Sequence, residues 1–122
     1  MKVTAPTILL ILLTVATVLH GQGQVDIVHA KAVRLRHLSG AVVDQKGMSI
    51  EYAFIELLNS ADRRVIATTY ADAQGKFSFA DQKRGELLEI RASREGFKSA
   101  QYTVSIAVVG KERLRMVLPV AV

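Results

Sequence analysis

The sequence predicts an all-β fold, with seven short strands in an antiparallel β-sandwich. Segments in which apolar and polar residues alternate recur at intervals of about eight to twelve residues, and turn residues bound each of them. No segment has a helical period long enough to compete, so the crossover helices that a parallel sheet requires are not expected. An Asp-x-x-Gly turn signal occurs twice, at residues 44–47 and 72–75.

The clearest of these segments is residues 68–79, which predict two strands joined by a tight turn. The side chain of Asp72 can accept hydrogen bonds from the turn amides, and Gly75 can adopt a positive φ without a Cβ clash. Phe77 and Phe79 then share one face, because side chains in a strand alternate with a period of two. This face is expected to anchor the core.

The other strands follow from the same alternation. A first strand is expected from Arg34 to Val43, and residues 65–71 form a strand whose inward face the pattern leaves open. Glu89, with Arg91 and Ser93, is expected to face water. The expected inward sets are Leu38, Gly40 and Val42; Ala53, Ile55 and Leu57; Leu88, Ile90 and Ala92; Tyr102, Val104, Ile106 and Val108; and Leu114, Met116 and Leu118.

The chain divides into three parts. Residues 1–23 predict a signal peptide, since Lys2 precedes an uncharged run at 7–19 and a small-x-small cleavage signal at 21–23. A membrane anchor is the alternative, but this run is shorter than the ~20 residues that span a bilayer, so no transmembrane span is expected after cleavage. Residues 24–33 form a leader or edge segment, and residues 34–122 form the domain.

Composition indicates a small, basic, exported domain. From Gln24 the chain has 15 Lys and Arg residues against 11 Asp and Glu residues, a net charge of +4. It has no cysteine, so the domain depends on its core and not on disulfides. Secreted eukaryotic domains of this size usually have disulfides, which favours a bacterial periplasmic or secreted location. Export also separates the protein from nucleic acid.

Four segments in order resemble the carboxypeptidase regulatory-like domain of the transthyretin-like sandwiches: residues 38–47, 53–57, 72–79 and 95–98. The resemblance implies a seven-stranded, immunoglobulin-like sandwich that serves as a structural or binding module, and it brings no catalytic residues. The family often has a proline after the first turn and a glycine before the second strand, where this chain has Ser49 and Tyr52. A proline-rich turn often precedes the fifth strand, where residues 82–84 stand here.

No catalytic, cofactor or metal site is predicted. Asp44 and Asp72 are calcium ligand candidates, but each turn offers one carboxylate where calcium takes six to eight oxygens, so turn capping is the better interpretation. His29 and His37 lack the partners of a zinc site. A small transthyretin-like hydrolase is the alternative function, although the Tyr-Arg-Gly-Ser tail of the hydrolase in that wider group is not found at residues 118–122.

Two surfaces are candidates for binding an envelope protein or an anionic surface polymer. One is a basic stripe, in which Arg34 and Arg36 share a face of the first strand and Arg113 and Arg115 share the outward face of the last. The alternative is that these arginines are simply solvated. The other is an exposed aromatic surface, which a sugar ligand would also require. Its candidates are Tyr52, Phe54 and Tyr70.

The signal peptide predicts a defined N-terminus for the exported protein. Mass spectrometry of the periplasmic or secreted protein should show a start at Gln22 or Gln24, after cleavage behind Gly21 or Gly23. Recovery of an intact chain beginning at Met1 from the membrane fraction would contradict this prediction.

Overall fold

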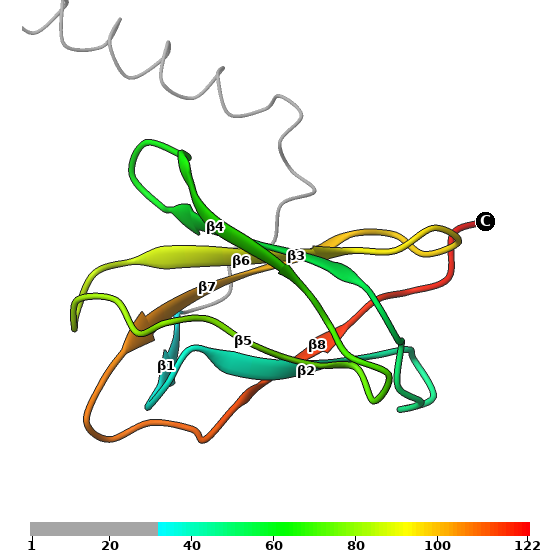
Figure 1. The fold of residues 1–122 in the computed structure, drawn as a ribbon, viewed down its shortest axis with the longest axis horizontal. Helices are drawn as coiled ribbons and strands as arrows, with labels where there is room; N and C mark the ends of the chain where they lie inside the picture. Colours follow the sequence, from blue (N-terminus) through cyan, green and yellow to red (C-terminus); the bar gives the residue numbers. More distant parts are fainter. Residues whose placement is uncertain (1–31) are drawn as a thin grey trace, which may run out of the picture.

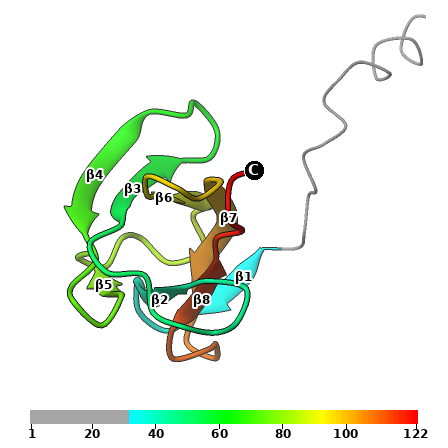
Figure 2. The same cartoon turned by 90° about the vertical axis from the view of Figure 1, so that its right-hand side faces the viewer.

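The computed structural model describes residues 32–122, which form a two-layer β-sandwich (Figure 1). A five-stranded sheet has the order β1-β7-β6-β3-β4, and a three-stranded sheet has the order β5-β2-β8. Viewed from the end, the five-stranded sheet curls over the three-stranded sheet (Figure 2). The strands are β1 (Val33–Leu35), β2 (Ser39–Val43), β3 (Phe54–Asn59), β4 (Val65–Tyr70), β5 (Lys76–Ser78), β6 (Leu88–Ser93), β7 (Ala100–Ile106) and β8 (Leu114–Val117).

The all-β sandwich predicted from the sequence is confirmed, with one more strand than expected. The predicted first strand from Arg34 to Val43 is two strands, β1 and β2, separated by a bend at residues 36–38. Leu35 and Leu38 are both fully buried, and residues three apart cannot share a face of one continuous strand. The bend lets both leucines enter the core and moves the chain from one sheet to the other.

Two strand pairs are parallel, contrary to the expectation of an antiparallel fold. β1 pairs in parallel with β7, and β2 pairs in parallel with β8. The expectation assumed that parallel neighbours need a crossover helix. In this sandwich the chain between the partners consists of strands of the two layers, so the return path needs no helix. The other pairs, β2 with β5, β3 with β4, β3 with β6 and β6 with β7, are antiparallel.

The core lies between the sheets and contains the inward sets that alternation predicts, with two corrections. Val108 is 65% exposed, because β7 ends at Ile106 and the chain has left the sheet by that point. Glu89 was expected to face water but is only 8% exposed. The most deeply buried large side chains are Leu35, Leu38, Ile55, Leu57, Leu88, Ile90, Met116 and Leu118.

Glu89 is covered although it lies on the outer side of the sheet. The turn between β3 and β4 rises over this side (Figure 1), and the Ser60 N–H donates to the Leu87 carbonyl oxygen at 3.2 Å. Arg63 in this turn places its Nη1 3.0 Å from Glu89 Oε1 and donates to Oε2 at 3.4 Å. The ion pair compensates the carboxylate charge, although Oε1 accepts no well-oriented hydrogen bond.

The two strands and the tight turn predicted at residues 68–79 are present, but the strands do not pair with each other as a hairpin; the turn joins the two sheets. β4 lies at the edge of the five-stranded sheet, and the Asp72 turn leads from it to β5 in the three-stranded sheet. Phe77 is buried against Gly40, its cross-strand partner in β2, and its ring lies 6.1 Å from that of Phe79, which is half-buried. The aromatic pair therefore anchors the three-stranded sheet in the core, as alternation predicted.

Replacing Phe77 with alanine should lower the free energy of unfolding by about 3–5 kcal/mol, because a large buried side chain is lost and a cavity remains. Denaturant unfolding monitored by circular dichroism measures this change. Phe79→Ala is the matched control and should cost less, since Phe79 is only half-buried. A loss below about 1 kcal/mol for Phe77→Ala would contradict the assigned role of the ring.

Candidate functional site

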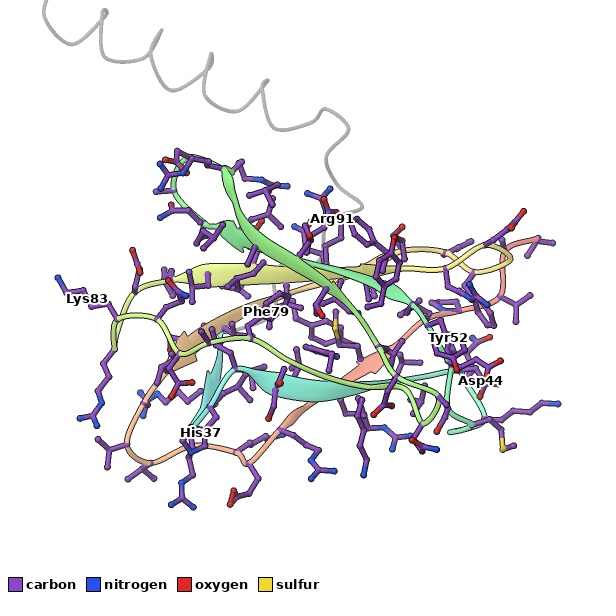
Figure 3. All side chains as sticks on the ribbon, viewed as in Figure 1. His37, Asp44, Tyr52, Phe79, Lys83 and Arg91 are labelled. Carbon is purple, nitrogen blue, oxygen red and sulfur yellow. The ribbon has the colours of Figure 1, made fainter. Side chains whose placement is uncertain are left out.

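A shallow hollow of about 390 Å³ lies at one end of the sandwich and brings together the three predicted aromatic residues, Tyr52, Phe54 and Tyr70. Tyr52 is 50% exposed and Tyr70 is 66% exposed, while Phe54 is half-buried between the core and the surface. Figure 3 shows Tyr52 at the same end of the molecule as Asp44. The remaining lining residues are Ser93, which ends β6, and five residues of the turn between β6 and β7: Arg94, Glu95, Gly96, Phe97 and Ser99.

Strand pairing places two of these aromatics side by side. Phe54 begins β3, Tyr70 ends β4, and the two are direct cross-strand partners. Their ring centroids are 5.3 Å apart with an interplanar angle of 49°, a tilted contact of the kind that aromatic pairs prefer. Sequence alternation could not predict this pairing, because it left the inward face of residues 65–71 open.

Tyr52 occupies a backbone conformation that disfavours tyrosine. Its φ is +56°, and its N–H donates to the Asp72 carbonyl oxygen at 3.3 Å. A left-handed conformation costs a residue with a Cβ roughly 1–2 kcal/mol, and glycine adopts it without this penalty. This is the position before the second predicted strand, where the resembled family often has glycine. The fold therefore does not require the tyrosine, which points to a role outside folding.

The opposite wall of the hollow was not predicted as part of a site. It is a tight turn in which Gly96 has a φ of +94° and the Phe97 N–H donates to the Arg94 carbonyl oxygen at 3.0 Å. Phe97 packs against the core and leaves Arg94 and Glu95 exposed. Residues 95–98 belong to the motif series that resembles the family, but their position beside Tyr52 depends on the tertiary fold.

The two Asp-x-x-Gly turns have the predicted capping role. Asp44 Oδ1 accepts from the N–H groups of Lys46 and Met48 at 2.8 and 2.9 Å, and Asp72 Oδ1 accepts from those of Gln74 and Lys76 at the same distances. The glycines of both turns have positive φ. Within residues 32–122 no group of three or more His, Cys, Asp or Glu side chains is arranged to hold a metal ion.

His37, the only histidine among residues 32–122, contacts Asp81. Its Nδ1 lies 3.2 Å from Asp81 Oδ2, and the Leu38 N–H donates to Oδ1 at 3.3 Å. The hydrogen bond with His37 and then the Leu38 N–H lower the pKa of Asp81. These contacts hold the loop after β5 against the bend between β1 and β2. His29 lies outside the described residues.

The predicted basic stripe is divided by the fold. Arg34 belongs to β1 of the five-stranded sheet, whereas Arg36 lies beyond the end of β1, so the two do not share a strand face. Arg36 Nη1 instead lies 3.3 Å from Glu112 Oε1. Arg115 lies in β8 of the three-stranded sheet, and Arg113 precedes this strand directly. Both are exposed, as predicted.

Comparison with known protein families agrees with this architecture. The carboxypeptidase regulatory-like domain family matches residues 37–119, which include β2 to β8 and the whole aromatic hollow. The chain belongs to this family. Membership confirms the resemblance and accounts for the sandwich, while Tyr52 is a feature of this chain that the family pattern does not require.

Solved structures show the same fold. Catechol 1,2-dioxygenase from Pseudomonas arvilla C-1 is similar to the chain with a TM-score of 0.50 at 12% sequence identity. The similarity covers 78% of this chain and 60% of the dioxygenase chain. At this identity it concerns the fold alone. No curated protein matches the chain in sequence.

The predicted signal peptide and most of the predicted leader segment at 24–33 fall outside the described residues; only Ala32 and Val33 of the leader are included, and Val33 begins β1. Within the part of the chain that the structure describes, no helix is long and apolar enough to cross a membrane.

The strained backbone of Tyr52 predicts an unusual order of stabilities. Tyr52→Gly should have a free energy of unfolding within about 1 kcal/mol of the parent, because relief of the left-handed strain offsets the loss of a half-exposed ring. Tyr52→Ala keeps the Cβ and should be less stable than Tyr52→Gly by about 1 kcal/mol. Chemical denaturation measures the free energy of unfolding of both variants. If Tyr52→Ala is more stable than Tyr52→Gly, the backbone of Tyr52 is not strained.

Proposed function

We propose that the chain is an exported, non-catalytic binding module of the bacterial cell envelope. In this proposal it adheres to an anionic envelope polymer through the outward face of its three-stranded sheet. Membership of the carboxypeptidase regulatory-like domain family supports a module of this kind. The observation that carries the proposal is the unequal distribution of charged groups between the two sheets.

Charges on the five-stranded sheet are balanced. Its strands contain two acidic and two basic residues, Glu56, Glu89, Arg34 and Arg91. Arg91 Nη1 lies 3.4 Å from Glu56 Oε1, and Arg63 from the neighbouring turn compensates Glu89. These paired charges have little attraction left for an external polymer, and Arg34 is the one charge of these strands that no described ion pair includes.

The strands of the three-stranded sheet contain only basic charges, Lys76 and Arg115. Both are cross-strand partners of Ala41, so the three residues form one row across the sheet. Their neighbours Phe77, Val42 and Met116 are buried, which directs this row outward. With strands about 4.8 Å apart, the two cationic residues stand roughly 10 Å apart at their Cα atoms.

The row has no acidic partner among the described residues. None of the ion pairs within residues 32–122 includes Lys76, Arg113 or Arg115. Arg113 adds a third exposed cation directly before β8. Lys76, Arg113 and Arg115 are hereafter called the cationic face. Unpaired charges in a row across a sheet are suited to an extended anionic polymer, whose charges repeat along its length.

The test reverses charge on the cationic face. Binding of the purified protein to bacterial wall fragments should weaken steeply between low and high salt, since exposed charges are screened within about 8–10 Å at physiological ionic strength. The double variant Arg113→Glu and Arg115→Glu should abolish this binding and leave the free energy of unfolding within about 0.5 kcal/mol of the parent. Sedimentation with the fragments measures binding.

The matched control carries the same charge change elsewhere. Lys83 (Figure 3) and its neighbour Arg84 are both exposed between β5 and β6, so Lys83→Glu with Arg84→Glu alters the net charge equally. This control should retain more binding than the Arg113 and Arg115 variant. If the two variants bind equally well, or the face variant binds like the parent, the cationic face is only solvated surface and a protein partner becomes the better hypothesis.

A further inference from the structure

We propose that the aromatic hollow formed by Tyr52, Phe54, Tyr70 and the 93–99 turn binds a neutral polysaccharide chain built of hexopyranose units. The lining of this hollow includes no residue of the cationic face, because it comes from the ends of β3, β4 and β6 in the five-stranded sheet, the residue before Ala53 and the turn after β6. The proposal therefore does not depend on binding to an anionic polymer.

The first argument is the exposure of the tyrosine rings. Tyr52 and Tyr70 leave half or more of their surface in water, although tyrosine rings gain free energy by burial. Tyr52 does so from a backbone conformation that glycine would adopt without strain. Neither packing nor the turn explains a tyrosine at this position. A ring with an apolar face and a polar hydroxyl is suited to a ligand that has both apolar and polar surfaces.

The second argument is the polar rim of the hollow. Ser93 and Ser99 contribute hydroxyl groups, and Arg94 and Glu95 contribute one positive and one negative charge. A ligand with a strong charge of either sign would be repelled by the rim residue of like charge. A neutral ligand rich in hydroxyls can form hydrogen bonds with donors and acceptors alike. A purely apolar ligand would leave this rim without partners.

A hexopyranose unit combines these two surfaces. The C–H groups of its ring faces form apolar patches that stack on aromatic rings, while hydroxyls project from the ring edge. The tilted Phe54 and Tyr70 rings, at 5.3 Å, provide one stacking surface, and Tyr52 provides a second on the same hollow. The polar rim then lies where ring hydroxyls can reach it.

The shape of the hollow favours a chain over a single sugar. At about 390 Å³ it has the volume of a small-ligand site, usually about 300–1,000 Å³, but it is shallow and open to water. A second hollow of about 390 Å³ adjoins it, with Tyr70 in both linings, and continues along Thr69, Asp72, Lys76, Phe77 and Ser78. Lys76 also belongs to the cationic face, so the two surfaces meet at this second hollow. Consecutive sugar units can therefore occupy the surface on either side of Tyr70.

The test uses two neutral oligosaccharides, cellohexaose and chitohexaose, titrated into the purified full chain by calorimetry and by NMR of the tyrosine ring protons. At least one should bind and shift the ring signals of Tyr52 and Tyr70. Tyr52→Gly and Tyr70→Ala should each weaken binding about tenfold or more, as expected for aromatic contacts that anchor an interface. Tyr52→Phe should retain most of the affinity, because the stacking face remains.

The control is Leu87→Ala, an exposed apolar residue outside the hollow, whose affinity should equal that of the parent. Tyr52→Gly is also a well-folded variant on the argument above, so its loss of binding cannot be attributed to unfolding. Absence of binding of both oligosaccharides would overturn the proposal. Equal binding by the parent and by both tyrosine variants would also overturn it, since the sugar would then lie elsewhere.

Discussion

The contact between the Phe77 ring and the backbone of Gly40 holds the smaller sheet of this sandwich in place. A Cβ at Gly40 would lie 2.6 Å from the ring and 2.6 Å from the Leu114 carbonyl oxygen, so all three strands of the sheet meet closely at this residue. Any side chain here would force β5 or β8 away from β2. The outward row of Lys76, Ala41 and Arg115 depends on this contact, because it sets the register in which the three residues align.

The same constraint separates the two candidate binding surfaces. Because side chains alternate along a strand, an inward Phe77 places Lys76 on the outer face. The Asp72 turn connects β5 to β4, whose last residue, Tyr70, lies at the end of the sandwich. The Tyr52 N–H bonds to the carbonyl oxygen of that Asp72, so the strained tyrosine is tied to the turn that begins β5. A cationic face on one layer and an aromatic hollow on the other are therefore two results of one arrangement. Under the two proposals, such an arrangement would let the module contact an anionic and a neutral polymer at the same time.

Several features follow from the sequence because they depend on neighbours along the chain. Alternation identifies Ile55, Leu57, Leu88 and Ile90 as buried, and the two Asp-x-x-Gly signals specify turns whose Asp side chains bond to amides two and four residues later. The family is recognisable for the same reason, since its motif series runs in order through these strands and turns. The exposed positions of Arg113 and Arg115 also follow from the burial of Leu114 and Met116.

Other features depend on contacts between segments that are distant in sequence, which local patterns do not encode. The bend after Leu35 exists because Leu35, at the end of β1, and Leu38, directly before β2, enter one core from different sheets, and it removes Arg36 from the predicted stripe. Glu89 is covered by Arg63 from another hairpin, against its local alternation. The sequence by itself determined which aromatics are available for a site, namely Tyr52, Phe54 and Tyr70. Only the tertiary structure decided that they share one hollow with the 93–99 turn, because strand pairing and the positive φ of Tyr52 set the positions of the rings.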